Sequence, residues 1–219
     1  MDARFWLQRW DNNETGFHKE EVNPALVEHL SKLSLADNSR IFLPLCGKTL
    51  DFAWLLARGY RVAGAELSES AIEQLFTQLG VKPNVSRSGK LKYYRAANID
   101  IYVGDIFHLT GETLGPIDAT YDRAALIALP PAMRGRYTAH LMDITGKAPQ
   151  LLLSFTYEPG IIEGPPFSVS NEEVARHYDK CYTRTLAESR YIPNGLHETH
   201  PATENVWLLE EKAAGAVDH

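Results

Sequence analysis

A turn with one glycine, and a carboxylate that follows it 19 residues later (66 − 47), are the first candidates for chemistry in this chain of 219 residues. The turn reads Leu45, Cys46, Gly47, Lys48, and Gly47 lets a ligand approach the backbone without a Cβ in the way. Glu66 lies close to the offset of roughly 20 residues at which a carboxylate meets ribose hydroxyls. The other glycines of a dinucleotide fingerprint are missing, so a pyrophosphate fits poorly. Turn and carboxylate together favour a nucleoside; the alternative is a tight turn and a solvated strand end.

Polar residues also follow the next two predicted strands. Asp105 and Ile106 come after the third, where a short polar side chain and backbone groups can meet an adenine edge. Asp122 and Arg123 come after the fourth and open an apolar run. Unpaired charges are costly to bury, so either these two residues pair with each other or Arg123 meets a carboxylate of the ligand. Spacing leaves both interpretations open, and both residues are candidates for positioning a substrate.

Aromatic side chains are dense near the N-terminus. Trp6 and Trp10 are four residues apart and share a helical face, so they can close over a cationic ligand. A cation above an aromatic ring gains about 0.5 to 2 kcal/mol. The alternative is that both rings pack a leading helix against the core. After the fifth predicted strand, the loop 160–167 contains Pro166 and Phe167, which we expect to form a wall for a substrate.

Composition limits the classes of partner. The net charge is −6, the pI is near 5.8, and no run of Lys or Arg can neutralise several phosphates, which disfavours nucleic acid. No stretch approaches the roughly 20 apolar residues of a membrane span, and no leader pattern opens the chain, so we expect a cytoplasmic protein without membrane contact. Cys46, Cys181 and the scattered histidines lack the spacing of a metal site, so we expect free thiols and no metal.

Alternating strand and helix patterns position these groups. The predicted strands are apolar or rich in β-branched and aromatic residues, and they cover 40–45, 61–66, 99–103, 119–121, 150–157, 182–189 and 205–209. Helical spacing and capping residues predict helices at 50–58, 68–80, 131–144 and 172–180, after a leading helix that Asn23 and Pro24 open.

This alternation predicts an α/β fold with a mostly parallel sheet and helices on both faces, because right-handed crossovers cover the sheet. The last two strands lie close together, so we expect them to form an antiparallel C-terminal edge hairpin. Seven strands in this arrangement are typical of the Rossmann-like fold of class I methyltransferases, whose ligands bind beyond the carboxyl ends of the strands. Given the chain length, we expect a single domain over 1–219, in which 1–35 forms an N-terminal helical lid.

Motifs spread over nearly the whole chain match one known family. They are Phe5, Trp6, Arg9 and Trp10; Gly16, Phe17 and His18; the segments 42–48, 64–69 and 105–107; Asp122, Arg123, Ala125 and Leu126; and the segments 164–167 and 207–209. In these motifs the chain resembles the thiopurine S-methyltransferase family, particularly its bacterial members. The segment 191–203 departs from the family's pattern, and a substrate-facing arginine expected there has no match.

The resemblance implies S-adenosyl-L-methionine as cofactor, whose methionine moiety has no phosphate and is compatible with a turn that has one glycine. It implies methyl transfer to the sulfur of aromatic or heterocyclic thiols, with selenium and tellurium species as further acceptors. The implied cofactor contacts are Trp10, Leu45, Glu66, Asp105, Ile106 and Arg123, and Phe17 would face the substrate. We expect a monomer that acts on a small molecule.

Two other functions stay open at this point. A nucleotide-dependent oxidoreductase can share this architecture, because fold does not fix function, although the missing glycines argue against it. A binding protein can keep the nucleoside pocket and transfer nothing. Binding of S-adenosylhomocysteine or NADH distinguishes the first alternative, and incubation with thiols distinguishes the second.

Overall fold

The computed structural model describes residues 3–12, 14, 19, 21–158, 160–196 and 200–213. The strands in this part of the chain are β1 (Arg40–Pro44), β2 (Arg61–Glu66), β3 (Asn84–Ser88), β4 (Leu91–Ala96), β5 (Ile99–Val103), β6 (Ala119–Asp122), β7 (Gln150–Thr156), β8 (Tyr182–Leu196) and β9 (His200–Glu211). The helices are α1 (Ala3–Asp11), α2 (Pro24–His29), α3 (Asp51–Ala57), α4 (Glu69–Leu79), α5 (Gly111–Leu114), α6 (Pro131–Ile144) and α7 (Asn171–Tyr178). Short 3₁₀ turns are η1 (Leu30–Leu33), η2 (Ile106–His108) and η3 (Leu126–Ala128).

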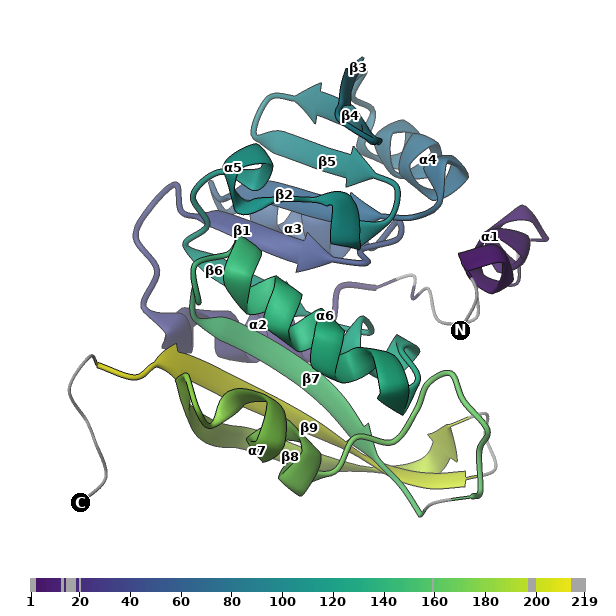
Figure 1. Ribbon diagram of the computed structural model, residues 1–219, viewed down its shortest axis with the longest axis vertical. Helices are drawn as coiled ribbons and strands as arrows, with labels where there is room; N and C mark the ends of the chain where they lie inside the picture. The colour runs from purple at the N-terminus through teal and green to yellow at the C-terminus, as the bar shows by residue number, and fades with distance from the viewer. Residues whose placement is uncertain are drawn as a thin grey trace.

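The described strands form one nine-stranded sheet in the order β3-β4-β5-β2-β1-β6-β7-β9-β8 (Figure 1). Strands β5, β2, β1, β6 and β7 are parallel, and β9 and β8 add the antiparallel edge hairpin that the sequence predicts. All seven expected strands form. Two more, β3 and β4, make a second antiparallel hairpin at the opposite edge. The sequence pattern missed β3 because its residues are polar and largely exposed, so no buried face marks it.

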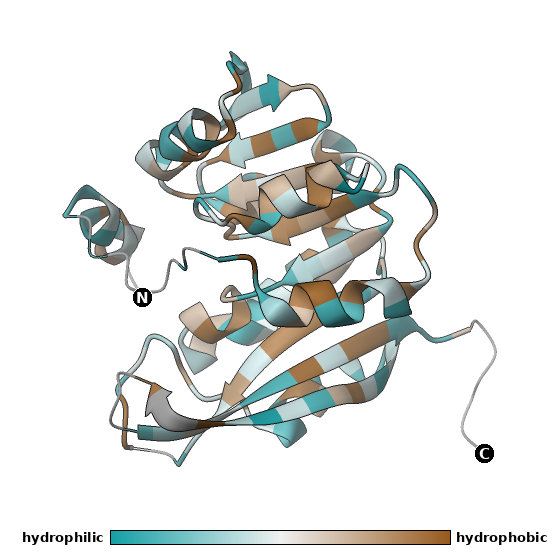
Figure 2. Cartoon of the chain, turned by 180° about the vertical axis from the view of Figure 1, so that it is seen from behind, coloured by the Kyte–Doolittle hydropathy of each residue, from teal (hydrophilic) through white to brown (hydrophobic). Residues whose placement is uncertain are grey.

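Helices cover both faces of the sheet (Figures 1 and 2). Alternate residues of a strand point to opposite faces, so Ile41 and Leu43 pack in one apolar cluster and Phe42 in the other. The first cluster includes buried residues of α2, α3 and α4, and the second includes residues of α5, α6 and α7. The core therefore consists of two apolar layers separated by the sheet, as the fold prediction requires.

Capping residues start the helices where the sequence predicts. The Asn23 side chain accepts from Ala25 N ahead of α2, the Ser68 hydroxyl from Ala71 N ahead of α4, and the Ser170 hydroxyl from Glu173 N ahead of α7. Gly80 ends α4 in the left-handed conformation. These capping residues therefore set the points at which the helices begin and end between the strands.

The predicted lid segment 1–35 separates into two parts. Residues of α2 and η1 are core residues, with Leu26 and Leu30 at most 2% exposed. Helix α1 instead stands beyond the ends of the sheet toward which the arrowheads of β1 and β5 point (Figure 1). A lid therefore stays a prediction, and it concerns α1. Within the described residues, no helix has the length and apolar character needed to cross a bilayer.

Asp122 links β6 to α6 inside the core. Its side chain is fully buried, Oδ2 accepts from the Tyr137 hydroxyl at 2.8 Å, and Oδ1 accepts from Leu126 N at 3.1 Å. Burial raises the pKa of this carboxyl from 3.8 to about 6, although both hydrogen bonds oppose the change. Because the folded state holds the proton more tightly than the unfolded chain, Asp122 stabilises the fold at low pH and loses that contribution as pH rises through about 6.

We predict that Asp122→Asn removes this titration. The difference in unfolding free energy between the wild type and the variant should shrink by up to about 3 kcal/mol as pH rises from about 4 to about 7. Urea denaturation at a series of pH values measures it. Asp143→Asn, at an exposed position of α6, is the matched control and should show a constant difference. A constant difference for Asp122→Asn as well would contradict the assigned pKa.

Candidate functional site

A cavity of about 970 Å³ opens at the carboxyl ends of the parallel strands. Its lining comes from α1, from the segments that follow β1, β2, β5 and β6, and from the β8–β9 hairpin. The site residues predicted from sequence that line it are Trp10, Leu45, Glu66, Asp105, Ile106, Arg123 and Pro166. Seven residues that are far apart in the chain thus share one cavity.

Glu66 is held at the end of β2 by two backbone amides. Its Oε2 accepts from Gly47 N at 2.8 Å and its Oε1 accepts from Ser68 N at 2.9 Å. The residue is 6% exposed, and burial raises the pKa of its carboxyl, whereas these amides lower it. Each carboxylate oxygen has a further lone pair, so Glu66 can accept from two hydroxyl groups of a ligand.

The turn after β1 brings backbone and aromatic surface together. Leu45 and Gly47 both have positive φ values, of 47° and 53°. A Cβ on Gly47 would lie 3.0 Å from Trp10 Cζ2, so only glycine allows this ring to approach so closely. Trp10 is 4% exposed although α1 stands at the rim of the sheet. The close neighbour of Gly47 in the structure is thus a side chain of the protein itself, and the approach of a ligand to this turn stays a prediction.

Cys46 is a poor nucleophile in this setting. Burial, followed by the charge of Glu66, raises the pKa of its thiol well above the ordinary value. The thiolate is the reactive form of cysteine, so this residue stays protonated near neutral pH. The turn therefore shapes the cavity and supplies no covalent chemistry.

At the end of β5, the side chain of Asp105 caps η2 by accepting from Phe107 N at 3.0 Å. Ile106 is 6% exposed, and its carbonyl oxygen lies 2.8 Å from His140 Nε2. Phe107 also lines the cavity, and the guanidinium of Arg136 lies 3.7 Å from its ring centroid. This corner offers a flat apolar surface beside one carboxylate.

Asp122 and Arg123 point to different places. Asp122 does not line the cavity and is bound to Tyr137, so its candidate role in substrate positioning would act only through other groups. Arg123 is half-buried in the cavity, and no ion pair joins it to Asp122. Its charge instead lowers the pKa of the Tyr121 hydroxyl and of the Glu204 carboxyl. Both of these residues line the same cavity. Of the two interpretations left open by spacing, mutual pairing does not occur.

The cavity residues that the sequence did not indicate include Asp51, Tyr121 and Glu204. Asp51 is 1% exposed and Tyr121 is 2% exposed, so both resemble core positions in the apolar stretches that contain them. Glu204 is half-buried on β9, and burial raises the pKa of its carboxyl while the charges of Arg190 and Arg123 lower it. No spacing in the sequence pairs these residues, because they come from three separate elements.

The walls of the cavity differ in part from expectation. Pro166 lines the cavity but Phe167 does not; the Arg134 guanidinium lies 5.6 Å from the Phe167 ring centroid, on the side of α6. Arg134 also bonds the Ser168 carbonyl oxygen at 3.2 Å, which ties this loop to the helix. Phe17 lies outside the described residues, so its predicted contact with a substrate stays a prediction.

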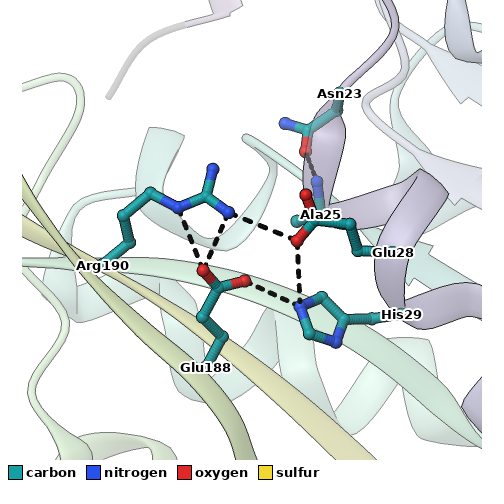
Figure 3. A network of polar contacts seen from close by, with 6 residues as sticks. All are labelled: Asn23, Ala25, Glu28, His29, Glu188 and Arg190. Carbon is teal, nitrogen blue, oxygen red and sulfur yellow. Dashed lines mark hydrogen bonds and ion pairs between the residues drawn. The ribbon is translucent and has the colours of Figure 1, made fainter.

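One cluster of possible metal ligands lies elsewhere, between α2 and β8 (Figure 3). It comprises Glu28, His29 and Glu188, whose ligand atoms lie within 4.8 Å of one another. The Arg190 guanidinium donates to Glu188 at 2.8 Å and to Glu28 at 3.3 Å, and His29 Nε2 lies 2.7 Å from Glu188. A cation of the chain itself thus already contacts both carboxylates, and the expectation of no metal stays a prediction.

Comparison with known proteins gives this cavity a context. A family model described as thiopurine S-methyltransferase matches residues 1–212. A thiopurine S-methyltransferase of Xanthobacter autotrophicus is 49% identical over 211 residues, which are 96% of this chain and 99% of that protein. One of Gluconobacter oxydans is 44% identical, over 94% of this chain and 96% of that protein.

Solved structures agree on the fold. A methyltransferase of Anabaena variabilis described as SAM-dependent has a TM-score of 0.64 at 16% identity and covers 95% of both chains. The 1,6-didemethyltoxoflavin-N1-methyltransferase of Burkholderia thailandensis, solved with S-adenosylhomocysteine, has a TM-score of 0.64 at 14% identity and covers 95% of this chain and 87% of that one. With the match over 1–212, these findings establish that the chain belongs to the thiopurine S-methyltransferase family.

Proposed function

We propose that this chain is an S-adenosylmethionine-dependent methyltransferase that transfers the methyl group to the sulfur of aromatic or heterocyclic thiols. Family membership and the printed names of relatives that are 42–49% identical support this function. The structural observation that carries it is the buried carboxylate of Glu66, held by Gly47 N at the rim of a largely apolar cavity. A carboxylate in this place suits the two hydroxyls of a ribose.

The order of the strands along the carboxyl edge of the sheet indicates which end of the cofactor would lie at which strand. Asp105 and Ile106 follow β5, Glu66 ends β2, Leu45 follows β1, and Arg123 follows β6, and these strands are neighbours in that order. Adenine would lie at Ile106 and the ribose at Glu66. The methionine moiety would then extend across Leu45 toward Arg123. The positive charge of Arg123 suits the carboxylate of the methionine moiety.

S-adenosylmethionine, when bound, supplies an electrophilic methyl group on a positively charged sulfur. Trp10 and Trp6 of α1 line the cavity, and aromatic side chains there would favour a cation and exclude water. Pro165 and Pro166 line the same cavity and would form the wall against which an acceptor is aligned with that methyl group. An aromatic thiol is already substantially ionised near neutral pH, so alignment and desolvation suffice without a strong base. Selenium and tellurium species share this soft nucleophilic character and are proposed as further acceptors.

We also propose a monomer that works in the cytoplasm. Both cysteines are free thiols, which fits a reducing compartment. Size-exclusion chromatography with light scattering and cell fractionation test these two statements.

Incubation of the purified chain with methyl-labelled S-adenosylmethionine and a panel of thiopurines, thiophenols, selenols and matched phenols tests the function. We expect labelled S-methyl products from the thiols and none from the phenols. Transfer to no member of the panel would favour the binding-protein alternative. Tight binding of NADH without binding of S-adenosylhomocysteine, measured by titration calorimetry, would favour the oxidoreductase.

Glu66→Ala should weaken binding of S-adenosylhomocysteine by about 1 to 3 kcal/mol, because hydrogen bonds to a charged acceptor are lost. Titration calorimetry measures the change, and circular dichroism checks the fold. Glu73→Ala, on the exposed face of α4, is the matched control and should leave affinity unchanged. Equal affinity for wild type and Glu66→Ala would remove Glu66 from the ribose.

Trp10→Ala should raise the dissociation rate of S-adenosylmethionine by a factor between about 2 and 30, equivalent to about 0.5 to 2 kcal/mol for a cation above an aromatic ring. Stopped-flow displacement measures the rate. Phe5→Ala on the same helix is the control, since Phe5 does not line the cavity. If Trp10→Ala unfolds the protein instead, the ring is a core residue and not part of a lid.

A further inference from the structure

Two side chains that line the cavity, Asp51 and Tyr121, each carry a buried oxygen atom that receives no hydrogen bond of standard geometry from the described residues. Asp51 is the first residue of α3, and its Oδ1 accepts from Asn23 N at 2.9 Å. Its Oδ2 is fully buried, and none of the residues described by the structure donates a hydrogen bond of standard geometry to it. A buried carboxylate oxygen without a well-placed donor is costly, so a ligand that donates to this atom would be stabilised there.

Tyr121 is the second such group. It is 2% exposed near the end of β6, and no described group lies in standard hydrogen-bonding geometry with its hydroxyl. Burial, then the charge of Asp51 and a side-chain hydrogen-bonding contact with Asp51, raise the pKa of this hydroxyl well above its ordinary value, so the two side chains are neighbours. Both residues line the cavity. A carboxylate and a phenol with acceptor capacity to spare therefore belong to side chains that line one cavity.

We propose that Asp51 and Tyr121 form the pocket for the α-ammonium group of the cofactor's methionine moiety. This assignment rests on the proposed function and extends it to two residues. An ammonium group has three donors and a positive charge, which matches two acceptors of which one is anionic.

Position along the sheet supports the assignment. The proposed adenosine contacts lie at β5 and β2, so the remaining part of the cofactor reaches β1 and β6. Asp51 lies in the segment after β1, and Tyr121 and Arg123 lie at the end of β6. The methionine moiety is a zwitterion, and this part of the cavity offers both signs: Arg123 for its carboxylate and Asp51 for its ammonium. Neither group alone would distinguish an amino acid from a simple acid or amine.

Titration calorimetry with three cofactor analogues tests the proposal. S-adenosylhomocysteine has both the amine and the carboxylate, its deamino analogue has only the carboxylate, and its decarboxy analogue has only the amine. The variant Asp51→Asn keeps the Oδ1 acceptor for Asn23 N and removes the charge. Tyr121→Phe is the second variant, and Asp37→Asn at an exposed position is the matched control.

We expect Asp51→Asn to weaken binding of S-adenosylhomocysteine and of the decarboxy analogue by about 10- to 100-fold, and to change binding of the deamino analogue by less than about twofold. Tyr121→Phe should show the same selectivity with a smaller loss. Retained binding of the deamino analogue also shows that the variant cavity is intact.

Equal losses of affinity for all three compounds, or no loss of affinity in either variant, would overturn the assignment. The proposed function would still stand if the wild-type chain binds S-adenosylhomocysteine. If Asp51 instead binds an inorganic cation, the affinity for S-adenosylhomocysteine would depend on the concentration of that cation and not on the amine of the compound. That result would also overturn the assignment. A wild-type chain that binds none of the three compounds would refute the proposed function and the assignment together.

Discussion

The structure of the site depends on burying the Glu66 carboxylate at the end of β2 without leaving it short of donors. Among the described residues, its hydrogen bonds come from the backbone amides of Gly47 on one side and Ser68 on the other. To bring the first amide into place, the chain after β1 must turn sharply, with positive φ at Leu45 and Gly47. Because Gly47 has no Cβ, the Trp10 ring packs directly on this turn, and α1 is held at the cavity through it. One buried charge therefore organises the turn, the ring and the N-terminal helix.

The order of the parallel strands turns these separate contacts into one elongated site. Each strand contributes the first residues after its carboxyl end, and the neighbours β5, β2, β1 and β6 place an apolar surface, a carboxylate, a turn and a cation in a row. A ligand with a nucleoside at one end and charged groups at the other fits such a row. Catalysis then needs little from the chain beyond alignment and exclusion of water, which agrees with a cavity whose thiol, that of Cys46, stays protonated.

Local signals carried most of the prediction from sequence. Caps at Ser68 and Ser170, the apolar strands and the spacing of Glu66 from Gly47 each depend on a few neighbouring residues, and all appear where expected. The missed features depend on tertiary structure. Strand β3 is polar and exposed, so it becomes a strand only by pairing with β4. Asp51 and Tyr121 look like core residues until the fold brings the start of α3 and the end of β6 to the same cavity. The path of the loop before α7, which turns Phe167 away from the cavity, likewise depends on Arg134.

Relatives in the thiopurine S-methyltransferase family share nearly the full length of this chain. In the function proposed for it, the buried carboxylate at the end of β2 receives the ribose of a bound adenosine. A crystal structure of the chain with S-adenosylhomocysteine would show whether it does. We expect both ribose hydroxyls on the Glu66 oxygens and adenine against Ile106. A ribose bound elsewhere, with the Glu66 oxygens contacting only Gly47 N and Ser68 N, would contradict it.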